Sequence, residues 1–286
     1  MPDLVPVFRF APSPNGFLHL GHAYSALLNA KMARETGGRL LLRIEDIDVA
    51  RCRPEYEGAI YEDLAWIGFN WEEPVRRQSE HLSNYARALD RLRHHDLTYP
   101  CFCTRGNIAR AIAGRADWPR DPDGSPLYPG TCRRLDAKTR EARLASSERP
   151  AWRLNMEKAI GVVEPLTWTE YGTGNVAQEL GAEPQAWGDV VVARRDIATS
   201  YHICVVVDDA AQDITDVVRG KDLFASTGVH RLLQVLLGLP APRYHHHELI
   251  TEAGGHKLSK SRGSPTLRDL RAGGMMPEKI RSAVGL

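Results

Sequence analysis

The segment from residue 5 to residue 22 constrains the fold more than any other part of this 286-residue chain. An apolar run at residues 5–10 is followed by Pro12, Pro14 and Gly16, and apolar residues at three- and four-residue spacing begin near His22. This order predicts a buried strand, a tight loop and the start of a helix. Free backbone N–H groups at a helix N-terminus bind anions, so the segment suits the phosphates of a nucleotide. It contains neither the G-x-G-x-x-G nor the G-x-x-x-x-G-K-[ST] pattern.

A second buried strand is predicted at residues 39–44, where a short apolar run follows the helix-ending pair Gly37-Gly38. Strand, helix and strand form the unit of a parallel α/β sheet, whose ligands bind at the carboxyl ends of the strands. Glu45 and the opening loop both fall at such ends. A carboxylate at Glu45 can accept a hydrogen bond from a substrate ammonium group; the alternative is a solvated acidic strand end.

Composition narrows the class of protein. The chain is 43% hydrophobic and 26% charged, as in a water-soluble enzyme with a sizeable core, and its length suggests about two domains. A net charge of +1 predicts that any contact with RNA uses a local basic patch. Five cysteines argue against a disulfide framework. Neither a signal peptide nor a run of about 18 apolar residues is present, so we expect a cytoplasmic monomer with no membrane contact.

Residues 99–149 show little hydrophobic periodicity, so this segment needs a stabilising crosslink or metal. Cys101, Cys103 and Cys132 are candidate ligands of a structural zinc ion, which commonly takes four ligands in a tetrahedron. The fourth would be His, Asp, Glu, water or, less commonly, Tyr; reduced structural cysteines are the alternative. Seven arginines here suit RNA phosphates, or else form a solvated face. They are Arg105, Arg110, Arg115, Arg133, Arg134, Arg140 and Arg143. The run His245-His246-His247 is expected at a strand edge rather than in a metal site.

Four motifs resemble those of one enzyme family, in the family's own order. Residues 9–22 contain R-F-A-P-S-P-x-G-x-L-H-x-G and H-L-G-H, which resemble the opening signature of class I aminoacyl-tRNA synthetases of the glutamyl/glutaminyl branch. L-R-I-E-D-I-D at residues 42–48 resembles L-R-I-E-D-T-D, with isoleucine where threonine is usual. Residues 192–220 resemble V-x-R-x-D-x-x-x-Y-x-x-x-V-V-x-D-D-x-x-x-x-I-T-x-V-x-R-G. H-K-L-S-K-S at residues 256–261 resembles the K-M-S-K-S loop, with leucine for methionine.

The resemblance implies an α/β fold: a Rossmann-like parallel sheet with an inserted zinc-containing subdomain and a short C-terminal helical segment. Residues 1–98 and 191–245 would form the two halves of the catalytic domain. Residues 99–190 would form the inserted subdomain, and residues 246–286 the K-L-S-K-S loop and the helical segment.

The resemblance also implies roles for individual residues. Those that would bind glutamate are Arg9, Phe10, Ala11, Pro12, Ser13, Glu45, Tyr201 and Arg219. Those that would bind ATP are His19, Gly21, His22, Lys257, Ser259, Lys260 and Ser261, with His19, His22, Lys257 and Lys260 as the catalytic set. C-x-C with Y-x-x-x-C resembles the zinc site of glutamyl-queuosine tRNA(Asp) synthetases, which implies one zinc ion per chain with Tyr128 as fourth ligand. Selection of glutamate over glutamine would rest on Arg9 and Arg219 having no acidic partner in the protein.

The implied chemistry is attack of glutamate's α-carboxylate on the α-phosphate of ATP, without tRNA and with Mg²⁺ held mainly by phosphates and water. Because the carboxylate is already a nucleophile, no general base is needed and the protein supplies positioning and charge stabilisation. Only 25 residues follow Ser261, too few for the anticodon-binding region of glutamyl-tRNA synthetases. The expected activity is therefore transfer of glutamate to queuosine at the first anticodon position of tRNA(Asp). A truncated glutamyl-tRNA synthetase and a catalytically inactive RNA-binding paralogue are the alternatives.

Overall fold

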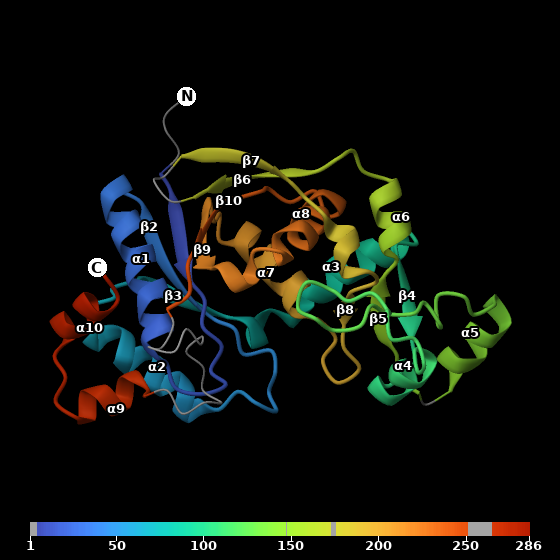
Figure 1. The fold of residues 1–286 in the computed structure, drawn as a ribbon, viewed down its shortest axis with the longest axis horizontal. Coiled ribbons are helices and arrows are strands. Elements are labelled where there is room, and N and C mark those ends of the chain that lie inside the picture. Colours follow the sequence, from blue (N-terminus) through green and yellow to red (C-terminus); the bar gives the residue numbers. More distant parts are fainter. Residues whose placement is uncertain (1–4, 147, 173–175, 251–264) are drawn as a thin grey trace.

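The computed structural model describes residues 5–146, 148–172, 176–250 and 265–286. Within these ranges the largest element is a seven-stranded sheet, shown in Figure 1. Its strands, in spatial order, are β3 (Glu72–Arg77), β2 (Arg39–Ile44), β1 (Val7–Phe10), β9 (Asp216–Gly220), β10 (Arg243–His247), β6 (Thr167–Tyr171) and β7 (Ala177–Gly181). All neighbours pair in parallel except β6 and β7, which form an antiparallel hairpin. The predicted Rossmann-like parallel sheet is confirmed.

Helices on the β1–β3 side of the sheet form one core, at the left of Figure 1. They are α1 (Leu20–Thr36), α2 (Pro54–Trp66), α9 (Leu267–Ala272) and α10 (Pro277–Ala283). α1 begins two residues before the predicted start, at a cap formed by His19, and ends at Gly37, whose left-handed φ of 62° suits glycine. The predicted strand–loop–helix order is confirmed.

A second core packs in the middle and right of Figure 1 around helices that cover the other half of the molecule. They are α3 (Leu82–His94), α6 (Met156–Gly161), α7 (Tyr201–Ala211) and α8 (Ser226–Leu236), with the short 3₁₀ helix η2 (Pro184–Trp187). Two other 3₁₀ helices, η1 (Gln78–His81) and η3 (Lys221–Leu223), contribute no residue to this core. The β-branched run at residues 203–209, which fits a strand or a helix start, is helical in α7. Six of the eleven residues of α7 are buried, because α3 and α8 both pack against this helix.

A smaller antiparallel sheet lies at the right of Figure 1, formed by β4 (Thr98–Cys101), β5 (Ala151–Leu154) and β8 (Val191–Ala193). α4 (Arg105–Ala111) and α5 (Ala137–Ala145) flank it and contain no buried residue. The segment's own core is a small cluster of Tyr99, Cys101, Phe102 and Cys132. This agrees with the expectation that residues 99–149 bury little apolar surface.

Three strands lie in a different sheet from the one that their predicted domain range implies. β6 and β7 fall within residues 99–190 yet extend the large sheet beyond β10, and β8 falls within residues 191–245 yet pairs with β5. The division into domains at these positions stays a prediction. Among the described residues, no helix combines the length and apolar character needed to cross a membrane.

Candidate active site and metal centre

A cavity of about 590 Å³ opens at the carboxyl ends of β1, β2 and β9. Its lining contains every residue predicted to bind glutamate and the predicted phosphate-binding residues of the helix start. These are Arg9, Phe10, Ala11, Pro12, Ser13, His19, Gly21, His22, Glu45, Tyr201 and Arg219. The structure thus brings together side chains that lie up to 210 positions apart. The predicted Lys257, Ser259, Lys260 and Ser261 lie outside the described residues.

The start of α1 is capped by two histidines instead of the usual hydroxyl and carboxylate groups. Nδ1 of His19 accepts a hydrogen bond from the backbone N–H of Gly21 at 3.1 Å, and Nδ1 of His22 accepts one from the backbone N–H of His19 at 3.1 Å. A neutral imidazole that accepts at Nδ1 carries its proton on Nε2. Each ring therefore presents an Nε2–H donor, the group that a phosphate oxygen requires. Gly21 leaves room for the His19 ring, because a Cβ at this position would lie 3.0 Å from it and the ring would have to shift.

Arg9 is held by a buried ion pair. Oδ1 of Asp209 accepts hydrogen bonds from Nε of Arg9 at 3.1 Å and from Nη1 of Arg43 at 2.7 Å. Burial opposes ionisation of Asp209, but the two guanidinium groups outweigh it and lower the pKa of this carboxyl. The expectation that Arg9 has no acidic partner is wrong, because its partner lies 200 residues away, where no local pattern points to it.

Glu45 is also paired within the protein. Nη2 of the fully buried Arg43 lies 3.2 Å from Oε1 of Glu45, and burial raises the pKa of Glu45 despite this contact. Its neighbours Asp46 and Asp48 are buried, the first accepting from Ser79 N–H and Oγ–H at 2.8 and 2.6 Å. The alternative of a solvated acidic strand end is therefore excluded. The carboxylate of Glu45 lines the cavity at a fixed position.

Arg219 differs from Arg9 in its partners. Among the described residues it has no acidic partner, as expected, and each of its five N–H bonds points to a neutral acceptor. These are Nε2 of His246 (3.0 Å), Nδ1 of His230 (3.2 Å), Oη of Tyr201 (3.5 Å), the Leu223 carbonyl (3.2 Å) and Oγ1 of Thr227 (2.8 Å). The contact with Tyr201 is the longest and weakest of the five.

The sequence analysis did not predict that His230 and His246 contribute to the site. Residues 245–247 form the carboxyl end of β10, in agreement with the strand-edge expectation, and β10 itself lies inside the sheet between β9 and β6. His246 is the register partner of Arg219 on β9, which places the two side chains next to each other. Only knowledge of the strand order could have revealed this pairing.

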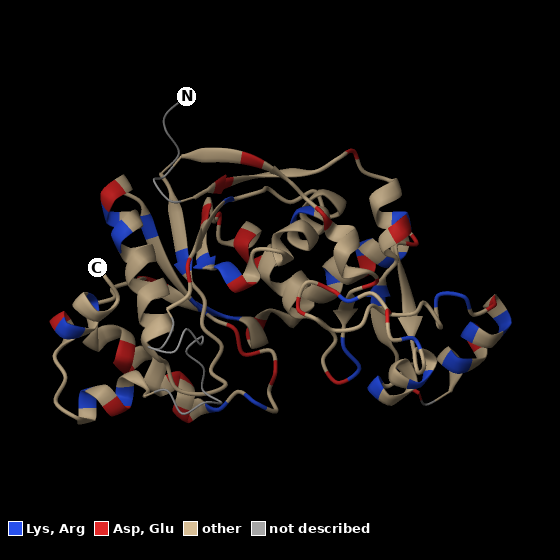
Figure 2. Ribbon diagram, in the orientation of Figure 1, with Lys and Arg blue, Asp and Glu red and all other residues tan. Residues whose placement is uncertain are grey.

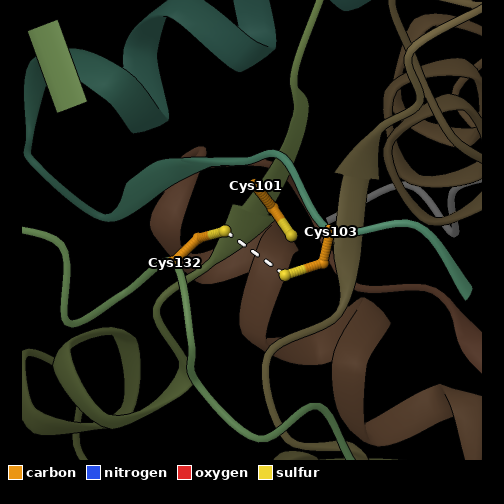
Figure 3. Close-up of side chains that lie close together, drawn as sticks. All are labelled: Cys101, Cys103 and Cys132. Atoms are coloured by element: carbon orange, nitrogen blue, oxygen red, sulfur yellow. Dashed lines mark hydrogen bonds between the residues drawn. The ribbon is translucent and has the colours of Figure 1, made fainter. Parts of the chain in front are cut away.

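Cys101, Cys103 and Cys132 bring their sulfur atoms within 4.8 Å of one another, as Figure 3 shows. Sγ of Cys103 lies 3.5 Å from Sγ of Cys132 and 3.4 Å from Oη of Tyr128. Sulfurs on a tetrahedral zinc ion are about 3.8 Å apart, since each Zn–S bond is about 2.3 Å. The four predicted ligands thus have a spacing that suits a metal ion.

Hydrogen bonds around this cluster favour a thiolate at Cys132, while the hydrogen bond with Cys132 and burial raise the pKa of the Cys101 thiol to about 12. The Phe102 backbone N–H donates to Sγ of Cys132 at 3.3 Å, and Nε of Arg153 donates to Sγ of Cys101 at 3.3 Å. The pKa of Cys132 is lowered to about 6, mainly by the hydrogen bond from Cys101. A thiol that ionises near neutral pH is suited to metal binding.

Six of the seven arginines predicted to suit RNA phosphates fall into two groups, and the seventh, Arg140, is half-buried. Arg133 contacts Asp189 at 3.4 Å and Arg143 pairs with Glu148 at 2.8 Å. Arg105 and Arg110 are exposed on α4, in the right-hand part of Figure 1, and Arg115 and Arg134 are exposed in the segment between α4 and α5. Figure 2 shows the basic segments of α4 and α5 in the same part of the view. The exposed group is the better candidate for contact with RNA.

Comparison with known proteins identifies the class of protein to which this chain belongs. Residues 6–286 match the model for the catalytic domain of class I tRNA synthetases (E and Q). A glutamate-tRNA synthetase from Elizabethkingia anophelis superposes with a TM-score of 0.80 at 27% identity, covering 99% of this chain. The present chain spans 61% of that protein's length. The fold is therefore that of a class I tRNA synthetase catalytic domain.

Two curated relatives narrow the family. A glutamyl-Q tRNA(Asp) synthetase from Rhodobacter capsulatus is 45% identical over 98% of this chain and 100% of its own length. Another from Symbiobacterium thermophilum is 41% identical over 95% of this chain and 83% of its own length. The chain belongs to the glutamyl-Q tRNA(Asp) synthetase family of class I tRNA synthetases.

Proposed function

We propose that this chain activates L-glutamate with ATP, without tRNA, and transfers the glutamyl group to queuosine at the first anticodon position of tRNA(Asp). One observation carries the proposal: the residues predicted to bind the amino acid and the phosphates line the same cavity. The similarity to two enzymes named glutamyl-Q tRNA(Asp) synthetase, over 98% and 95% of this chain, supports the choice of tRNA.

Glutamate would be held through both of its ends. Its side-chain carboxylate enters between Tyr201 and Arg219, whose 3.5 Å contact is the easiest to replace, and accepts a hydrogen bond from each. The ammonium group donates to the fixed carboxylate of Glu45. Selection against glutamine then depends on Arg219, because the charge of Arg9 is balanced by Asp209.

Activation would take place at the start of α1. Nε2–H of His19 and of His22 donate to phosphate oxygens of ATP, and Lys257 and Lys260 neutralise the triphosphate. Mg²⁺ accompanies ATP, bound mainly by phosphates and water. The glutamate α-carboxylate attacks the α-phosphate and pyrophosphate leaves. The protein contributes alignment and stabilisation of the developing charge.

Cys101, Cys103, Tyr128 and Cys132 would hold one structural zinc ion, because their spacing and their N–H donors suit a thiolate-rich site. Zinc would tie the loop before α4 to the loop before α5. The exposed arginines of this segment would contact the tRNA backbone. With mature tRNA and ATP as substrates, the protein would act in the cytoplasm.

Two assays test the proposal. Glutamate-dependent exchange of pyrophosphate into ATP, measured without tRNA, should be detected, and Lys260→Ala should reduce it more than tenfold while the fold survives. Absence of exchange in the wild-type protein would indicate the inactive RNA-binding paralogue. Acylation should require queuosine-containing tRNA(Asp); equal acylation of queuosine-free tRNA would indicate a glutamyl-tRNA synthetase that charges the 3′ end.

A further inference from the structure

Arg219 is anchored by buried side chains that extend behind the cavity to Glu170 on β6. Nε of Arg219 donates to Nε2 of His246 at 3.0 Å, and Nδ1 of His246 lies 2.7 Å from Oε2 of Glu170. The Glu170 residue is 5% exposed and the His246 side chain 1% exposed. Glu170 does not line the cavity, so it can influence a substrate only through His246 and Arg219.

The direction of each hydrogen bond follows from the chemistry of the groups. A guanidinium group has only donors, so Nε2 of His246 must accept from Arg219. A neutral His246 then carries its proton on Nδ1 and donates it to Glu170. Glu170 also accepts from the His246 backbone N–H at 2.9 Å and from Nε1 of Trp168 at 3.1 Å. Three donors converge on this carboxylate, which therefore fixes both the position and the tautomer of the imidazole.

On the other side of Arg219, the direction of the hydrogen bonds made by His230 follows from the same argument. Nδ1 of His230 must accept from Nη1 of Arg219, so its Nε2–H donates to Nδ1 of His202 at 3.2 Å. Burial and the nearby Arg219 charge lower the pKa of His230, in agreement with a neutral ring. Arg219 is thus held on two sides by neutral imidazoles. No carboxylate of the described residues contacts Arg219 directly, in contrast to Arg9, whose charge is balanced by Asp209.

We propose that Glu170 and His246 are positioning residues of the glutamate site. Glu170 holds His246 in the Nδ1–H tautomer, and His246 holds the Arg219 guanidinium at the cavity wall without neutralising it. A carboxylate in direct contact with Arg219 would position it equally well but would compete with the substrate. Because a neutral imidazole lies between Glu170 and Arg219, the guanidinium group is held in place while its positive charge stays available to the substrate. The inference rests on the proposed function, because it assumes that Arg219 receives the glutamate side chain.

Glu170→Gln tests the role of the carboxylate with almost no change in shape. In one arrangement, the amide NH₂ of the new side chain faces one of the three N–H donors and a hydrogen bond is lost. In the other, His246 carries its proton on Nε2, and this N–H then faces the Nε–H of Arg219. In the exchange assay we expect the KM for glutamate to rise about tenfold, the size expected for one hydrogen bond to a charged group. The KM for ATP should stay within about twofold, since the phosphate donors lie on α1.

A matched pair of substitutions at His246 separates positioning from folding. His246→Asn places an amide NH₂ near the position of Nδ1, so Glu170 keeps a donor while Arg219 loses its acceptor; the glutamate KM should rise. His246→Gln places an amide oxygen near the position of Nε2, so Arg219 keeps an acceptor and the glutamate KM should remain closer to the wild-type value. Should Glu170→Gln fail to fold, this pair still tests the proposal.

A double variant tests whether Glu170 acts through His246. If it does, adding Glu170→Gln to His246→Asn should raise the glutamate KM less than twofold further. Glu179→Gln, the same substitution on the exposed neighbouring strand β7, is the control and should leave both KM values unchanged. An unchanged glutamate KM in Glu170→Gln, an equal rise in both KM values, or multiplicative effects in the double variant would overturn the proposal. Lack of glutamate-dependent exchange by the wild-type protein would instead refute the proposed function.

Discussion

Replacing Asp209 with Asn should destabilise the protein strongly, although the side chain keeps its shape. Asp209 belongs to a cluster of six charged side chains, four buried and two half-buried, in which three arginines face three carboxylates. The cluster consists of Arg9, Arg43, Arg76, Glu45, Asp208 and Asp209, with closest contacts of 2.7 Å between Arg43 and Asp209 and 2.8 Å between Arg76 and Asp208. The charges balance, so neutralising one carboxylate leaves one buried positive charge without compensation.

The size of the effect follows from this charge count. Removing one partner of a buried ion pair costs about 3–5 kcal/mol, and we expect the lower end because the Asn oxygen still accepts one hydrogen bond. For a chain of this size, each kcal/mol lowers the melting midpoint by roughly 2 °C, so the Asp209→Asn midpoint should fall by about 6 °C. Thermal melting followed by circular dichroism at neutral pH measures this shift.

Two further variants make the measurement decisive. Asp196→Asn removes an exposed carboxylate whose side chain is 59% exposed and lies 2.6 Å from Arg194, and should change stability by less than about 1 kcal/mol. Adding Arg43→Gln to Asp209→Asn restores charge balance, so the double variant should lose less stability than the sum of the single losses. A midpoint for Asp209→Asn close to that of Asp196→Asn, or strictly additive losses, would refute the charge argument.

Three other predictions concern separate parts of the chain. Burial raises the pKa of Asp63 from 3.8 to about 6, and Arg271, 3.4 Å away, only partly opposes this. The folded state therefore binds the proton more tightly than the unfolded state, and the ionised carboxylate lowers stability above about pH 6 but not below about pH 4. Asp63→Asn should raise the urea midpoint at neutral pH, with a gain that disappears toward about pH 4. Cys132→Ser should reduce bound zinc, measured by atomic absorption, from one ion per chain to well below one. Lys257→Ala should raise the KM for ATP more than the KM for glutamate in the exchange assay.

Features encoded by neighbouring residues were predictable from the sequence. Two prolines and a glycine between an apolar run and a helical pattern predicted β1, the loop and α1, because the turn and helix signals lie within a few residues of each other. The short run before Glu45 predicted β2 with its observed bounds. C-x-C and Y-x-x-x-C predicted the clustering of Cys101, Cys103 and Cys132, since ligand spacing is local even where the loop between them is not.

Features that depend on strand order were not predictable. Asp209 lies 200 residues from Arg9, and Glu170 lies 76 residues from His246; neither pair has a local signal in the chain. Glu170 reaches His246 only because β6 joins the large sheet beside β10, although its position fell within the range expected for the inserted subdomain. Residues 245–247 were expected at a strand edge, and nothing local in this run showed that its strand would lie beside β9 and bring His246 to Arg219.

The two arginines of the cavity show why this distinction matters for function. Both lie at the carboxyl ends of neighbouring parallel strands, and the sequence gives no reason to treat them differently. Asp209 balances the charge of Arg9 and makes it part of the wall, while His246 and His230 hold Arg219 and leave its charge for a ligand. A site that must select a carboxylate over an isosteric amide needs one such uncompensated charge, because a paired arginine would bind either side chain by hydrogen bonds alone. If the proposed function holds, the selectivity of the cavity is determined by residues that do not line it, contributed by β10, α8 and α7.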